Sequence, residues 1–70
     1  MKYRLFTNDR GRKDGIPMYS ALKDVEAETP EAAVSTVVWY LRIAPLAPAK
    51  AIPWPAEDQE SKDWLAKHVG

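Results

Sequence analysis

The side chains that most often carry out catalysis are sparse in this 70-residue chain, which has no cysteine and a single histidine, His68. A nucleophilic site needs a hydroxyl or thiol beside a base that a third group orients, and no nucleophile-elbow motif surrounds Ser20, Ser35 or Ser61. Ser61 lies seven positions before His68, but two residues on one stripe of a helix explain that spacing. Without cysteines a thiolate zinc site is excluded, and a single histidine cannot make a histidine-rich metal site. We therefore expect no enzymatic activity, no metal and no cofactor.

Acidic residues gather in two places, and neither group has the spacing of a known site. Paired carboxylates can perform acid–base chemistry, and a cluster can hold a hard cation, but no calcium-loop pattern is present. A solvated strand face and the positive end of a helix macrodipole explain the two groups. These groups are Asp24, Glu26 and Glu28, and Glu57, Asp58 and Glu60.

Basic residues concentrate at the N-terminus: residues 1–23 hold six basic and two acidic residues, whereas residues 24–41 hold four acidic and no basic ones. The segment "GRKDG" (Gly11–Gly15) lacks P-loop spacing and is typical of a hairpin tip. The net charge of zero makes the whole chain a weak attractor of nucleic acid. A nucleic-acid-binding function is therefore the alternative prediction, and it would use Lys2, Arg4, Arg10, Arg12 and Lys13.

The aromatic and proline-rich second half is the better candidate for a binding surface. Trp54 stands between Pro53 and Pro55, which fix the backbone and remove two hydrogen-bond donors. A tryptophan held in this way suits an interface anchor, and it equally suits a plug on the open end of a small sheet. Trp64, on the apolar stripe of a short helix, is expected to dock that helix. The candidate protein-interaction residues are Trp54, Pro53, Pro55, Trp39, Tyr40 and Trp64.

Two strands are expected in the first third of the chain. Lys2–Asn8 alternates and is rich in β-formers, and Asn8–Gly15 is a turn that is too long for a tight two-residue hairpin. Met18–Glu28 is the return strand, although its apolar pattern slips by one position. Either a β-bulge near Leu22–Asp24 or a break into two short strands would restore the register.

Two helices follow. In Thr29–Ala44, Thr29 is a suitable N-cap, Pro30 suits the first helical position and Pro45 ends the helix. The second helix is expected over Pro55–Gly70, where acidic residues come first and basic residues last, as the macrodipole favours.

A third strand over Ala49–Ile52 is possible between the helices, limited to an edge by Pro48 and Pro53. The predicted fold class is therefore α+β: one domain, residues 1–70, with a small antiparallel sheet of two or three strands. One main helix packs across the sheet, and a short C-terminal helix covers an edge or an end of it (β-β-α-(β)-α).

A chain of this size has a marginal core, so self-association through a sheet edge, giving a homodimer, is an open possibility. No membrane span or signal peptide is readable, and the lack of cysteine fits a cytoplasmic location. The predicted function is a small non-enzymatic module that binds another protein. The β-β-α start with "VEAETPEAA" has a build common in short accessory proteins of phages and mobile elements. If the chain belongs with these proteins, inhibition of a host protein, including an anti-defence (anti-CRISPR-like) role, is one function consistent with that build. A homo-oligomer that binds a small ligand is a further alternative.

Overall fold

The structure is a computed structural model that describes residues 1–8, 10–38 and 49–69. The expected end of the first helix, at Ala44 and Pro45, lies outside the described residues, as do Trp39 and Tyr40. In chain order the elements are β1 (Lys2–Thr7), β2 (Arg12–Lys13), β3 (Ile16–Pro17), β4 (Ser20–Glu26), α1 (Pro30–Val38), β5 (Ala49–Pro53) and α2 (Gln59–His68).

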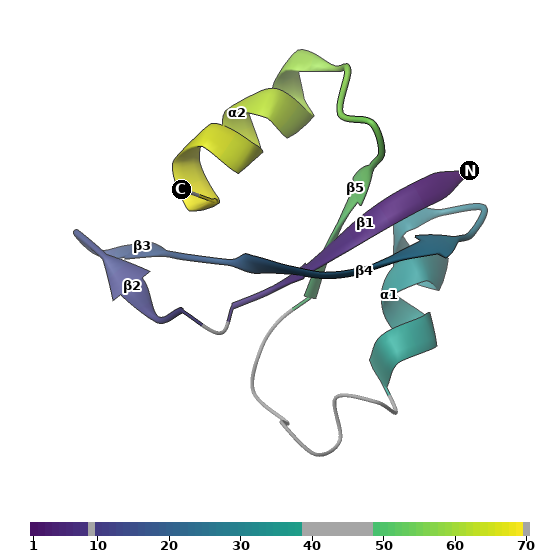
Figure 1. Cartoon of the computed structure of the whole chain (residues 1–70), viewed down its shortest axis with the longest axis horizontal. Helices are drawn as coiled ribbons and strands as arrows, with labels where there is room; N and C mark the ends of the chain where they lie inside the picture. Colours follow the sequence, from purple (N-terminus) through teal and green to yellow (C-terminus); the bar gives the residue numbers. More distant parts are fainter. Residues whose placement is uncertain (9, 39–48, 70) are drawn as a thin grey trace.

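The fold is α+β, which confirms the predicted class. β4, β1 and β5 form an antiparallel sheet in the order β4-β1-β5, and β2 and β3 form a separate two-stranded ribbon. The segment over Ala49–Ile52 does form a third strand, and it occupies one edge of the sheet. Figure 1 shows the three strands fanning out with a strong twist, while the β2–β3 ribbon projects from the end opposite the N-terminus.

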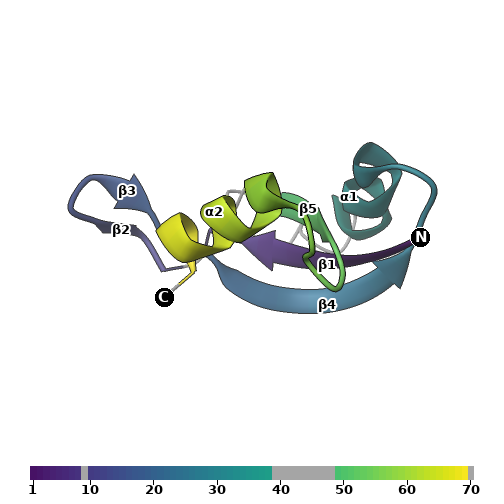
Figure 2. The same ribbon diagram turned by 90° about the horizontal axis from the view of Figure 1, so that it is seen from above.

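The two helices lie on opposite faces of the sheet (Figures 1 and 2). Successive residues of β1 alternate between these faces: Leu5 belongs to the core cluster under α1, whereas Phe6 meets Trp64 of α2 at a ring-centroid distance of 5.6 Å. The C-terminal helix therefore covers the second face of the sheet rather than an edge or an end. The reason is that β1 carries one large apolar side chain, Phe6, on its second face beside Lys2 and Arg4, and Phe6 needs its own cover.

The core between the sheet and α1 is small and closely packed. It consists of Tyr3, Leu5, Ala33 and Ala51, of which Leu5 and Ala33 have no exposed surface. An alanine on the helix facing an alanine on β5 lets the two backbones approach closely. This close approach fixes α1 beside the β5 edge of the sheet.

The slip in the apolar pattern of the return strand is a β-bulge. Leu5 pairs with Lys23 and Phe6 pairs with Ala21, so the register passes over Leu22. β4 remains one strand, which decides between the two predicted alternatives. The prediction of a bulge at this position is confirmed.

The segment before β4 contains a tight two-residue turn, contrary to expectation. Asp14 and Gly15 have φ angles of 53° and 79°, the left-handed pair that a type I′ hairpin turn requires. The whole Asn8–Gly15 segment is too long for such a turn, but its last four residues together with Ile16 and Pro17 build one. The correct signal was the Asp-Gly pair.

Both helices start at side-chain caps. The Thr29 hydroxyl accepts a hydrogen bond from the Ala32 amide at 3.0 Å, and Pro30 is the first helical residue, as predicted. α2 starts later than the sequence pattern suggested, because Asp58 is its N-cap and accepts from the Ser61 amide at 2.9 Å. No helix in the described part of the chain is long and apolar enough to span a membrane.

Candidate protein-binding groove

Trp54 is half-buried. Its position is therefore intermediate between the two predicted alternatives, a core plug and an exposed anchor. Its ring lies 6.2 Å from Phe6, centroid to centroid, and under the guanidinium of Arg4, whose central carbon is 4.1 Å from the ring centroid. Its amide donates to the Lys2 carbonyl at 2.9 Å. Trp54 is therefore fixed in place while part of its ring remains accessible. Pro53 beside it is half-buried and Pro55 is exposed.

Trp64 belongs to an aromatic cluster that docks α2 onto the sheet. Its ring lies 5.6 Å from Phe6, 4.9 Å from Tyr19 and 5.0 Å from His68. The C-terminal end of the helix is also tied to the chain before β4, since a ring nitrogen of His68 lies 2.8 Å from the Pro17 carbonyl and the Tyr19 amide donates to the His68 carbonyl. The expectation that Trp64 docks its helix agrees with these contacts.

The edge of β5 that faces away from β1 has backbone groups that pair with no strand in the described part of the chain. The bond from the Trp54 amide to the Lys2 carbonyl marks these two residues as a hydrogen-bonded pair. Because such pairs alternate along an antiparallel ladder, Lys50 and Ile52 also turn their amides toward β1. The amides and carbonyls of Ala49 and Ala51 then point outward, where the described residues provide no neighbouring strand.

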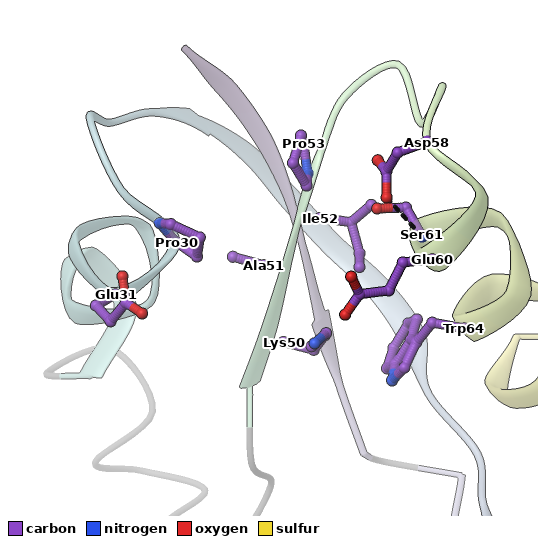
Figure 3. Close-up of a pocket in the computed structure, with 10 residues that line it drawn as sticks. All are labelled: Pro30, Glu31, Lys50, Ala51, Ile52, Pro53, Asp58, Glu60, Ser61 and Trp64. Carbon is purple, nitrogen blue, oxygen red and sulfur yellow. Dashed lines mark hydrogen bonds between the residues drawn. The ribbon is translucent and has the colours of Figure 1, made fainter.

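This edge lies at the bottom of a groove with a volume of about 410 Å³ (Figure 3). The start of α1 forms one wall and the start of α2 forms the other, with β5 between them. Ala51, Ile52 and Ser61 form a buried floor. The lining residues are Pro30, Glu31, Lys50, Ala51, Ile52, Pro53, Asp58, Glu60, Ser61 and Trp64.

The rim of the groove is acidic. Glu31 lies on the α1 side, Glu60 lies on the α2 side, and the Asp58 carboxylate is held charged because hydrogen bonds from the Ser61 amide and hydroxyl lower its pKa. Lys50 contributes one positive charge, and each of the two helix N-termini adds about half a charge. The three carboxylates therefore leave the groove with a net charge of about minus one.

The opposite edge of the sheet, along β4, is protected against pairing with another strand. The bulge at Leu22 interrupts its register, and its exposed residues include Lys23 and Asp24. Bulges and charged side chains both discourage the addition of another strand. Of the two edges in the described part of the sheet, the one along β5 is therefore better able to pair with an added strand.

Two of the predicted interaction residues, Pro53 and Trp64, line this groove, and Trp54 and Pro55 follow directly after β5. The positions of Trp39 and Tyr40 lie outside the described residues. Sequence reasoning missed the groove residues Glu31, Lys50, Asp58 and Glu60. The available signal was the pair of prolines that confine a short strand to an edge, combined with acidic residues at the starts of both helices.

The basic residues of the nucleic-acid alternative fall into two separate places. Lys2 and Arg4 both bind Asp24, at 3.4 and 2.7 Å, at the end of β1 near the N-terminus. The other three, Arg10, Arg12 and Lys13, line a hollow of about 210 Å³ beside the β2–β3 ribbon. This ribbon lies at the far end of the sheet from the N-terminus (Figure 1). The structure thus brings together three of the five predicted residues.

Ser61 and His68, which are seven positions apart in the sequence, both have structural contacts. Ser61 is buried and binds the cap residue Asp58, while His68 binds Pro17. Among the described residues, no group of three His, Asp or Glu side chains is placed to hold a metal ion.

A scan against protein-family models, a search of curated proteins and a search of solved structures each found no match to this chain. The function is therefore inferred from the geometry of the groove and of its surroundings.

Proposed function

We propose that this protein is a small non-enzymatic interaction module that binds another protein through the β5 edge and the adjoining Trp54. The observation that carries the proposal is the outward-facing backbone of Ala49 and Ala51 along the β5 edge, which from Lys50 to Pro53 lines a groove between two helices. Exposed edges of this kind are templates for pairing with another chain.

The charge of the groove favours a protein over a nucleic acid at this surface. Three carboxylates line it, and phosphate groups would be repelled by them. The half-buried Trp54 provides an apolar contact next to the edge, and tryptophan is among the residue types most enriched at interface hot spots. The finer expectation, that the bound protein is a host factor that this chain inhibits, stays a prediction.

Site-specific photo-crosslinking tests the proposal. A photoreactive amino acid is placed at Lys50, in the groove, and in a matched variant at Leu22, on the opposite edge; both positions are exposed. In an extract of the source organism, the position-50 variant is expected to crosslink to a distinct protein that the position-22 variant does not capture. Equal crosslinking from both positions, or none from position 50, would contradict the proposal.

A further inference from the structure

The occupant of the β5 edge can be inferred from the chemistry of the groove, and the inference rests on the function proposed above. We propose that the groove binds an extended segment of another protein that adds to β5 as a fourth strand and carries basic residues at two neighbouring positions. The free backbone of the edge selects the extended conformation, and the acidic rim selects the charge.

The number of available backbone groups limits the paired length. Ala49 and Ala51 each present one donor and one acceptor, and Pro53 presents a carbonyl without a donor. The pairing therefore covers about five residues of the partner. So few main-chain bonds give little specificity, because any extended chain can form them. The side chains around the edge must supply the selection.

The two walls of the groove meet the two faces of an added strand. Successive residues of a strand point to opposite faces, so one residue of the partner would face Glu31 on the α1 side and the next would face Glu60 on the α2 side (Figure 3). Both glutamates are exposed and can reach a lysine or arginine. Two adjacent basic residues in the partner would then form one ion pair with Glu31 and one with Glu60.

The positive charge of Lys50 disfavours a second copy of this chain as the occupant. If two β5 strands paired antiparallel with Ala49 opposite Ala51, each Lys50 would lie directly opposite the other Lys50, and like charges in that position are destabilising. Moving the register by two residues would place Ala49 opposite Pro53, which has no amide to donate. A foreign segment can avoid both restrictions, because its basic residue on the α2 side can lie opposite Ile52 rather than Lys50, and it need not place a proline opposite Ala49.

The test uses the intact chain and a displayed library of random twelve-residue peptides. Peptides selected on the wild-type chain are expected to carry adjacent lysine or arginine residues within a run of β-forming residues. Selected peptides without basic residues, or the failure to select any peptide, would overturn the inference.

Variants of the chain then separate the backbone contribution from the charge contribution. Ala51→Pro removes an outward amide without touching the β1 ladder, and it is expected to weaken binding of the selected peptides more than tenfold. Ala49→Pro removes the other outward amide, at a less buried position, and replaces Ala51→Pro in the test if that variant fails to fold. The double variant Glu31→Gln/Glu60→Gln is expected to weaken binding about three- to tenfold, within the range for two exposed ion pairs. The matched control Glu57→Gln/Asp63→Asn removes two acidic charges outside the groove and is expected to bind as the wild type does.

The outcomes distinguish the inference from the proposed function. If a protein still crosslinks at position 50 but binds Ala49→Pro and Ala51→Pro normally, the surface is used without strand addition, and only the inference fails. If no protein crosslinks at position 50, the proposed function fails first. If light scattering shows a dimer that Ala51→Pro dissociates, the edge holds a second copy, and the basic-segment inference is overturned.

Discussion

The guanidinium of Arg4 lies over the ring of Trp54, with its central carbon 4.1 Å from the ring centroid, and it also donates two hydrogen bonds to Asp24, at 2.7 and 3.1 Å. This arrangement joins the second face of the sheet to the segment that follows β5. Trp54 is therefore held by a residue of the central strand, and its accessible part is presented beside the open edge.

The contact between Arg4 and Asp24 predicts a measurable titration. The hydrogen bonds from Arg4 lower the pKa of Asp24 to about 2. Because this value is below that of the unfolded chain, the ionised carboxylate stabilises the fold above about pH 4, and the contribution is lost as the pH falls toward 2. In Arg4→Gln the pKa of Asp24 is expected to rise toward its ordinary value, as measured by carboxyl NMR. An unchanged titration curve in the variant would contradict this contact.

Two leucines provide a matched test of the core. Leu5 has no exposed surface, whereas Leu22 is 36% exposed at the bulge. Leu5→Ala is expected to cost about 2–5 kcal/mol, which is comparable with the whole stability of a domain this small, so most of the chain should unfold. Leu22→Ala is expected to change the free energy of unfolding by less than about 0.5 kcal/mol. Urea titrations followed by circular dichroism measure both changes. Similar losses of unfolding free energy in the two variants would contradict the placement of Leu5 in the core and Leu22 at the surface.

Proline substitutions along β5 test which backbone groups face outward. Lys50→Pro removes an amide that points to β1 and leaves the Phe6 carbonyl without its donor, at a cost of about 1–3 kcal/mol. Ala49→Pro removes an outward amide and is expected to cost less than about 1 kcal/mol, because the proline also restricts the unfolded chain. Thermal unfolding of the two variants should therefore differ clearly. The reverse order of stability would show that the register of β5 is shifted by one residue.

The aromatic cluster predicts that α2 depends on Trp64 more than on any of its charged residues. Trp64 contacts Phe6, Tyr19 and His68, and an isolated helix of ten residues is marginal in water. Trp64→Ala is expected to lower the free energy of unfolding by about 2–3 kcal/mol, less than for a fully buried tryptophan, and to reduce the helical circular dichroism signal. The exposed substitution Lys62→Ala on the same helix serves as the control, and an equal effect of the two would show that the cluster does not hold the helix.

The sequence predicted the elements of the fold where a local signal exists. Thr29 and Pro30 mark the start of a helix through capping chemistry, and the misplaced Leu22 marks the bulge through the two-residue period of a strand. The Asp14–Gly15 turn carried an equally local signal that the length of the surrounding segment obscured. In each of these cases the information lies within a few neighbouring residues.

The groove could not be predicted in the same way, because its parts come from three segments that only the folded chain brings together. Glu31 and Glu60 are 29 positions apart, and each is explained locally by a helix macrodipole. Their shared position beside Ala51 depends on α1 and α2 taking opposite faces of the sheet. That arrangement follows from Phe6, whose need for cover becomes evident only once Leu5 is known to face α1.

Amide hydrogen exchange along β5 tests the central claim most directly, because it reports on each backbone group separately. In the free protein the amides of Lys50 and Ile52 should be protected by β1, while those of Ala49 and Ala51 should exchange rapidly. When a selected basic peptide is bound, exchange at Ala49 and Ala51 should slow by at least tenfold. Protection of these two amides in the free protein, or unchanged exchange with the peptide bound, would contradict the proposal that the β5 edge receives an added strand.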